Sequence, residues 1–351
     1  MKNYLVLVTL FCVFITADTA LAAKPTPYMQ WDRNSAMTAA RSVNVEIAVN
    51  ELTNISSLAD GEATLESLRH METRGDWPIP AREAALYQFT QSLAELPRSA
   101  VAVEVMQHLE TYEARTLVPN EHHGNTLVPL FNIRGAAAGV ENRWQRTEFT
   151  AKGSRMLESN PEGLVSAYAK SGNNNEQFGY LDALGQATWA EVIAVQNAAL
   201  DQFEQSPELT RVIGETAAMT ADTYAAQQLL MNGRGAGLAS ALRQLDEQLP
   251  SPETAALLTY AIQQAPSHNA SLAIAAWWPR LRHEAAIRDL LVDQLADPKL
   301  GGAAALALAQ SPDIQTIKIL QDTAGNDSVA GRRAQMALDI NRNRLVGEVQ
   351  Q

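Results

Sequence analysis

The sequence predicts an all-α fold in which antiparallel helix pairs stack in series as an α–α superhelix. Apolar residues recur at helical spacing, as Leu258, Ala261, Ile262 and Ala265 do at i, i+3, i+4 and i+7. One pattern of helix start occurs several times, and the C-terminal part repeats itself at a period of about 30 residues. No run of residues alternates in the way that a half-buried strand would.

Composition and charge exclude several classes of protein. The chain has 351 residues and a formal net charge of −12, and 46% of its residues are hydrophobic. This apolar content is too high for a disordered chain, and the apolar runs are too short for a polytopic membrane protein. An acidic chain without a basic patch repels a polyanion, which argues against nucleic acid as a partner. We expect a neutral or basic protein or peptide partner and no cofactor.

The first 22 residues have the pattern of a cleavable signal peptide. Lys2 supplies a positive charge, an apolar stretch runs from Leu5 to Ala17, and cleavage is predicted after Ala22. The apolar stretch is too short to be retained as a membrane span, so we expect a periplasmic or secreted protein. Cys12 is the only cysteine and lies in this segment. We therefore expect neither a disulfide nor a cysteine-ligated metal in the mature chain.

Residues 23–205 are predicted to be a helical region, with degenerate repeats of the same kind. Proline positions predict one helix over Pro80–Glu95 and another from Ser99 to about Tyr112. The polar segment 171–176 is the one loop at which a domain boundary is reasonable. A continuous solenoid is favoured over two independent domains.

Four helix starts share a Ser or Asn, then a proline, then an acid. The first residue can cap free N–H groups, proline suits the first helical position, and the acid faces the positive end of the helix dipole. Thr188 and Glu191 predict a capping box for a further helix. The four starts are Asn160-Pro161-Glu162, Ser206-Pro207-Glu208, Ser251-Pro252-Glu253 and Ser311-Pro312-Asp313.

Self-similarity is clearest within residues 206–345, which are predicted to be the repeat region. A period near 30 with two short helices per unit is typical of a helical solenoid, and small residues let adjacent layers approach closely. Shifted by 30 positions, Ala304, Leu306, Ala307 and Leu308 fall on Ala334, Met336, Ala337 and Leu338.

With these motifs, the segment from about Ser251 to Leu345 resembles HEAT repeats of the short type. The stretch Val329–Leu338 is similar to the family pattern Val-Arg-x-x-Ala-x-x-Ala-Leu. Gly301 and Gly302 depart from it, because the family favours a basic residue there. The resemblance implies stacked antiparallel helix pairs and a surface that binds other macromolecules. Residues 346–351 are left as a C-terminal tail.

Two adjacent tryptophans are the most suggestive feature outside the predicted core. Successive helical positions are about 100° apart, so we expect at least one of the two indoles to reach the flank or surface. Trp and Arg are common hot-spot residues there, and the alternative is that both indoles are partly buried between layers. Arg332 and Arg333 are weaker candidates, because the resemblance implies that such an arginine makes hydrogen bonds between repeats. The candidate binding residues are Trp277, Trp278, Arg280, Arg282, Arg332 and Arg333.

A metal site is the alternative interpretation of Glu121, His122 and His123. Imidazoles and a carboxylate can bind zinc, although His70 and His108 would have to join them through the fold. The other interpretation is a solvated polar loop. The glycine-rich segment 232–237 is likewise either a phosphate cradle or a helix C-cap and connection, and the helical pattern before it favours the C-cap.

No nucleophile motif of the Gly-x-Ser-x-Gly or Ser-x-x-Lys type is present. We therefore expect a non-catalytic exported scaffold or binding protein that presents a solenoid surface to its partner. An inhibitor, an immunity protein and an assembly factor all fit this description. The alternatives are a hydrolase that uses the loop at 121–123, with metal or acid–base chemistry, and a carrier of an apolar ligand.

Overall fold

The computed structural model describes residues 29–57, 61–122 and 126–349, with side chains described except at 29, 55–57 and 345–349. These residues form eighteen α-helices, two 3-10 helices and three strands of two to four residues. The all-α prediction is confirmed. None of the described helices combines the length and apolar content needed to cross a membrane. The predicted signal peptide, residues 1–22, lies outside the described residues.

The chain divides into two compact units, residues 1–140 and 141–351. The division falls within α6 (Ile133–Ser159). The boundary predicted at residue 205 therefore lies inside the second unit, just after α9 (Trp189–Gln202). The predicted loop at 171–176 contains the connection between α7 (Pro161–Lys170) and α8 (Asn174–Leu184).

The described part of unit 1 consists of five α-helices, one 3-10 helix, a small sheet and the start of α6. The two helices predicted here are present: α4 with the 3-10 turn η1 covers the first, and α5 covers the second, whose predicted first residue Ser99 is the N-cap. Its hydroxyl accepts a hydrogen bond from the Ala102 N–H at 3.1 Å. The helices are α1 (Arg33–Ala40), α2 (Val45–Ser57), α3 (Gly61–Thr73), α4 (Ile79–Ser92), η1 (Leu93–Glu95) and α5 (Ala100–Glu110).

The sheet of unit 1 is a feature that the sequence analysis missed. Its order is β1-β2-β3, with β1 (Met29–Gln30) parallel and β3 (Leu127–Pro129) antiparallel to β2 (Thr116–Pro119). In the second pair Val118 lies opposite Val128. Strands this short carry too few residues for an alternating pattern to be recognised.

A buried carboxylate joins this sheet to α4. Glu83 is fully buried and accepts hydrogen bonds from the Tyr112 hydroxyl at 3.1 Å and from the N–H groups of Arg115 and Thr116 at 2.6 and 3.0 Å. Burial raises the pKa of Tyr112 far above its ordinary value, and the negative charge of Glu83 is the second cause of the rise. These three bonds fix the chain at the start of β2.

Unit 2 contains the rest of α6, twelve further α-helices and one 3-10 helix among its described residues. Beyond those already given they are η2 (Pro207–Leu209), α10 (Thr210–Thr220), α11 (Thr223–Asn232), α12 (Gly235–Gln248), α13 (Ser251–Gln264), α14 (Ser267–Leu281), α15 (Ala285–Gln294), α16 (Gly301–Ala309), α17 (Ile314–Ala324) and α18 (Val329–Val349).

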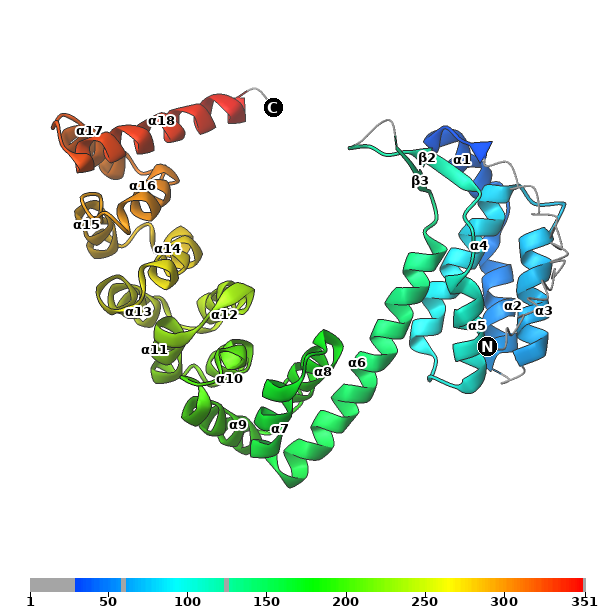
Figure 1. The fold of residues 1–351 in the computed structure, drawn as a ribbon. Coiled ribbons are helices and arrows are strands. Elements are labelled where there is room, and N and C mark those ends of the chain that lie inside the picture. The colour runs from blue at the N-terminus through cyan, green and yellow to red at the C-terminus, as the bar shows by residue number, and fades with distance from the viewer. Residues whose placement is uncertain (1–28, 58–60, 123–125, 350–351) are drawn as a thin grey trace, which may run out of the picture. The chain divides into compact units, whose positions relative to one another are not determined.

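The helices of unit 2 form two layers. The even-numbered helices α8 to α18 pack on one another in chain order, and so do the odd-numbered helices α7 to α15. Figure 1 shows the even-numbered row on the inner side of the arc of unit 2, and we call it the inner layer. One apolar core runs between the layers from Leu157 to Ala337, so each pair buries its apolar faces against its neighbours. This packing is that of an α-solenoid.

The predicted helix starts occur at the expected places, but the capping atoms differ. Asn160 caps α7 and the Thr188–Glu191 capping box is present, both as predicted. Ser251 is instead the first residue of α13, without a side-chain cap, and Asp313 rather than Ser311 caps α17. The start at Ser206 leads into a 3-10 turn before α10.

Side-chain donors tie each repeat to the one before. The last carbonyls of a helix lack partners within that helix, and here an Asn or Arg one repeat later supplies them. The bonds span 30 to 39 residues. They run from Asn269 to the Leu230 and Gly233 carbonyls, from Arg280 to those of Asp246 and Leu249, from Arg333 to those of Leu295 and Asp297, and from Asn341 to those of Ala309 and Ser311.

Candidate functional site

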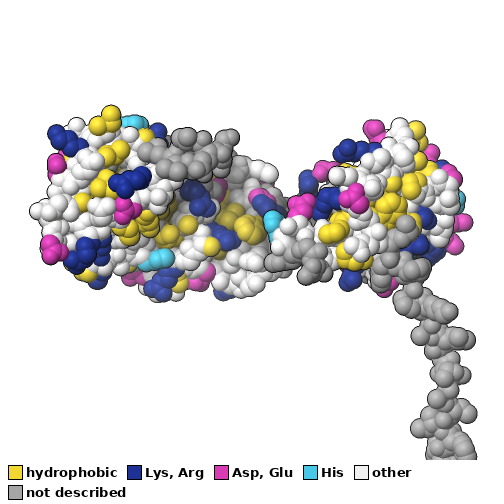
Figure 2. All heavy atoms as spheres, turned by 90° about the horizontal axis from the view of Figure 1, so that it is seen from above, with side chains coloured by type: hydrophobic (Ala, Val, Ile, Leu, Met, Phe, Trp, Pro, Cys, Tyr) yellow, Lys and Arg dark blue, Asp and Glu magenta, His cyan; other side chains and the backbone are white. Residues whose placement is uncertain are grey.

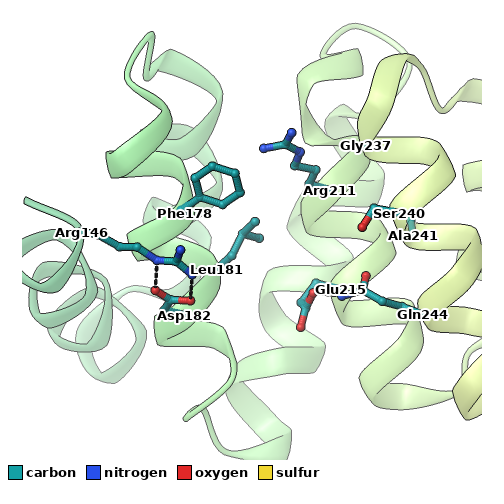
Figure 3. Close-up of a pocket in the computed structure, with 10 residues that line it drawn as sticks. All are labelled: Arg146, Phe178, Leu181, Asp182, Arg211, Glu215, Gly237, Ser240, Ala241 and Gln244. Carbon is teal, nitrogen blue, oxygen red and sulfur yellow. Dashed lines mark hydrogen bonds and ion pairs between the residues drawn. The ribbon is translucent and has the colours of Figure 1, made fainter. Parts of the chain in front are cut away.

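A cavity of about 490 Å³ lies on the inner layer of unit 2. One wall comes from α6 and α8 and the other from α10 and α12 (Figure 3). A second cavity of about 880 Å³ shares Leu181, Asp182 and Glu215 with the first and continues between α6 and α8 to Gln186. We call the two together the inner groove. The first cavity is lined by Arg146, Phe178, Leu181, Asp182, Arg211, Glu215, Gly237, Ser240, Ala241 and Gln244.

Glycines bring the helices of each wall together. A Cβ on Gly179 of α8 would lie 2.7 Å from the Arg146 carbonyl oxygen and 2.9 Å from the Thr150 nitrogen of α6. On the other wall, a Cβ on Gly214 of α10 would collide with the side chain of Ala241 on α12. Each wall is therefore a closely packed helix pair, and the groove lies between the two pairs.

Arg146 is held by a carboxylate of its own wall. Its Nη2 donates to Asp182 Oδ1 at 2.6 Å and its Nε donates to Oδ2 of the same side chain (Figure 3). The hydrogen bonds that Arg146 donates to Asp182 raise the pKa of Arg146. This bidentate pair satisfies both charges within the wall.

Phe178 lies between two guanidinium groups. The Arg146 and Arg211 guanidinium carbons are 5.2 and 4.9 Å from its ring centroid, within the range of cation–π attraction. Arg146 belongs to the same wall as Phe178, whereas Arg211 reaches it from α10 across the groove (Figure 3). Among the described residues Arg211 makes no ion pair, in contrast to Arg146.

Gly237 gives Arg211 its room. A Cβ at this position of α12 would lie 2.8 Å from Arg211 Cγ, so the arginine stem occupies the space that a larger residue would need. Farther along the same wall, Glu215 accepts a hydrogen bond from Gln244 Nε2 at 2.9 Å, and Ser240 is exposed. The groove thus presents Arg211, which hydrogen-bonds Tyr168 but has no carboxylate partner among the described residues, together with an aromatic face and hydrogen-bonding groups, a combination suited to binding.

The predicted binding residues Trp277 and Trp278 lie elsewhere, in the core of α14. They are 0% and 1% exposed, so the expectation that one indole reaches the surface is wrong. The reason is the width of the buried stripe: α14 packs on α11, α12, α13 and α16, and two adjacent positions are buried in each turn. Trp277 Nε1 donates to the Leu242 carbonyl at 2.8 Å. Both indoles are structural.

The four predicted arginines do not gather with one another or with the groove. Arg280 and Arg333 bind helix C-terminal carbonyls, as the family resemblance implied for Arg333. Arg282 donates to His283 at 3.2 Å on an exposed turn. Arg332 is exposed and lies 3.5 Å from Asp327.

The predicted alternative metal residues lie in the β2–β3 connection of unit 1. Glu121 pairs with Arg33 at 3.3 Å, and the His122 N–H donates to Asn120 Oδ1 at 2.9 Å. His123 lies outside the described residues. Within the part of the chain that the structure describes, no three His, Cys, Asp or Glu side chains are close enough to hold a metal ion.

The remaining histidines of that alternative do not join the loop. His108 Nε2 lies 2.7 Å from Glu72 Oε1, which ties α5 to α3, and His70 lies in the last turn of α3. The glycine-rich segment 232–237 is the predicted helix C-cap and connection. Gly233 is the C-cap of α11, and Gly235 has a φ of +68°, which favours glycine.

Comparisons of the chain with protein-family models, with curated proteins and with solved structures give no match. The resemblance to HEAT repeats stays a prediction, and the function is argued from the geometry of the inner groove.

Proposed function

We propose that this chain is a non-catalytic, exported α-solenoid protein that binds a peptide or protein segment along the inner groove. The observation that carries the proposal is the pair of adjoining cavities on the inner layer. Half-buried Phe178 faces Arg211 across the first of them, and Arg211 has no carboxylate partner among the described residues. Arg and aromatic residues are the commonest sources of binding energy at protein interfaces.

The hydrogen bonds that other arginines make to the fold support the inner groove as the binding site. Arg280 and Arg333 donate hydrogen bonds to carbonyls of the preceding repeat, whereas Arg211 binds no helix end among the described residues. A solenoid buries its core between layers, which leaves the exposed side chains of the inner layer available to a partner.

Charge and compartment are part of the same proposal. Basic and acidic side chains are interspersed over both units on the face seen in Figure 2, and the net charge of −12 favours a neutral or basic partner. The signal-like pattern at residues 1–22 supports a location in the periplasm or outside the cell as part of the proposal.

Peptide selection tests the proposal. Peptides from a random displayed library would be selected on the purified chain and then measured by fluorescence anisotropy against two variants. Ser240→Trp fills the groove, whereas Gln263→Trp places the same ring on an exposed position of α13 in the outer layer. We expect Ser240→Trp to weaken binding at least tenfold and Gln263→Trp to leave it unchanged. Equal binding to both variants, or no selected peptide, contradicts the proposal.

A further inference from the structure

We propose that the inner groove receives the C-terminal end of a polypeptide, with the terminal carboxylate on Arg211. This inference rests on the proposed function and specifies its ligand. Three features of the groove carry it: a guanidinium with no carboxylate partner among the described residues, the contact of that guanidinium with Phe178 across the groove, and the apolar and polar groups beside it.

The first feature is that the positive charge of Arg211 is not balanced by a carboxylate among the described residues. The chain has 39 acidic and 27 basic residues, so an arginine near other side chains usually finds a carboxylate. Arg146, on the opposite wall, has one in Asp182. Arg211 has no carboxylate partner among the described residues, and its planar fork matches a carboxylate through two parallel hydrogen bonds.

The second feature is the direction of the groove. Arg211 and Phe178 meet across it with 4.9 Å between the guanidinium carbon and the ring centroid, and this contact bridges α10 and α8 (Figure 3). In the other direction the groove continues past Leu181 and Asp182 to Gln186. A segment lying in the groove therefore ends at Arg211, which is the place for a chain terminus and not for an internal residue.

The third feature is what surrounds the guanidinium. Phe178, Leu181 and Ala241 offer an apolar surface for the last side chain, and the exposed Ser240 hydroxyl is available to the peptide backbone. The stacking on Phe178 holds the plane of the guanidinium, which also donates a hydrogen bond to the Tyr168 hydroxyl and has further N–H donors for a ligand. The first cavity, at about 490 Å³, falls within the roughly 300–1,000 Å³ of small-ligand sites.

The test uses three N-acetylated, fluorescently labelled tripeptides that differ in whether they carry a carboxylate and where it lies. The first ends in phenylalanine with a free carboxylate, the second is its C-terminal amide, and the third is an amide with an internal aspartate. Binding to the full chain is measured by anisotropy, and the ¹H–¹⁵N signal of Arg211 Nε is followed in parallel. We expect the free acid to bind at least tenfold more tightly than either amide and to shift the Arg211 signal.

Two arginine variants decide whether Arg211 is responsible. Arg211→Gln should abolish the preference for the free acid, and Arg211→Lys should retain part of it. Arg243→Gln, the same change at an exposed position of α12 outside the groove lining, should leave the preference intact. Circular dichroism of each variant confirms that it is folded.

Three results would overturn the inference: equal binding of acid and amide, equal binding of the internal aspartate peptide, or an unchanged preference in Arg211→Gln. Absence of binding by all three tripeptides also overturns it. The proposed function fails separately, because it requires only that library-selected peptides lose binding in Ser240→Trp.

Discussion

The two buried tryptophans of α14 offer a stability comparison within one helix. Trp277 and Trp278 are adjacent and almost fully buried, but their indole N–H groups differ. Trp277 Nε1 donates to the Leu242 carbonyl at 2.8 Å, whereas Trp278 Nε1 has no hydrogen-bond partner among the described residues. We predict that Trp277→Phe destabilises the protein more than Trp278→Phe.

The size of the difference follows from the hydrogen bond. Both substitutions remove the same atoms from equally buried positions, so the loss of apolar burial largely cancels between them. Trp277→Phe also loses a hydrogen bond with a net contribution of about 1 kcal/mol. Trp278→Phe removes a buried, unsatisfied donor whose desolvation costs about 1–3 kcal/mol. The free energies of unfolding should therefore differ by about 2 kcal/mol or more.

Urea unfolding followed by far-UV circular dichroism measures this difference. The two variants expose the same surface on unfolding, so their m-values should agree and the midpoints should report stability directly. Hydrogen exchange offers a second readout, because the Trp277 indole proton should exchange more slowly than that of Trp278. Equal midpoints, or a lower midpoint for Trp278→Phe, would refute this account of how α14 packs.

Two further predictions concern the glycine pair Gly301 and Gly302 and the half-buried phenol of Tyr112. Gly301→Ala should lower stability by about 1–3 kcal/mol in thermal unfolding, since its Cβ would collide with the Arg333 guanidinium and lie 2.8 Å from the Leu295 carbonyl oxygen. Gly302→Ala meets nothing within 4 Å and should be neutral or stabilising by up to about 1 kcal/mol, and the opposite order would contradict the packing. Burial and a neighbouring carboxylate raise the pKa of Tyr112, so the folded state keeps a proton that the unfolded state releases above about pH 10. The resulting stability is full below pH 10 and declines as the pH rises, by at most about 1.4 kcal/mol per pH unit. Unfolding midpoints between pH 9 and 11 should fall less steeply in Tyr112→Phe, and an identical slope would contradict the assignment.

The helices of the repeat region could be predicted because each of them has signals within its own sequence. Apolar spacing and the Pro-acid starts involve neighbouring residues, and these signals placed α13, α17 and the capping box at Thr188. The strands β1, β2 and β3 were missed because they have two to four residues each and are defined by their pairing partners. Pairing between Met29 and Thr116 leaves no mark in either local segment.

The Trp277–Trp278 prediction failed for a reason of the same kind. A single helix packed on one neighbour buries a narrow stripe, and on that premise one indole must be exposed. In α14 the premise does not hold, because helices of both layers cover it. The width of a buried stripe depends on how many neighbours a helix has, which the sequence of that helix does not state.

The residues of the inner groove were missed because their relationships span repeats. Arg146 pairs with Asp182, 36 positions away, and Arg211 depends on Gly237, 26 positions away. Both separations are close to one repeat, but Arg146 and Asp182 lie upstream of residue 206, where the period was not recognisable, and Arg211 and Gly237 precede the segment from about Ser251 that resembles HEAT repeats. Gly237 carried the available signal, since a glycine within a helix often marks the close approach of another group.

In one repeat a helix glycine makes room for an arginine that binds helix-end carbonyls, and in another it makes room for an arginine that, among the described residues, has no carboxylate partner. In α16, Gly301 makes room for Arg333, whose guanidinium then reaches the Leu295 and Asp297 carbonyls and is satisfied by them. In α12, Gly237 makes room for Arg211, but there the guanidinium stacks on Phe178 and meets no carboxylate or helix end among the described residues. Besides its hydrogen bond to Tyr168, the Arg211 guanidinium has further N–H donors that still require acceptors. If the groove binds a carboxylate, Gly237→Ala should weaken binding of the free-acid tripeptide and spare binding of the amide, since the added methyl displaces the arginine stem. A loss of both in equal measure would show that Gly237 shapes the groove and not Arg211.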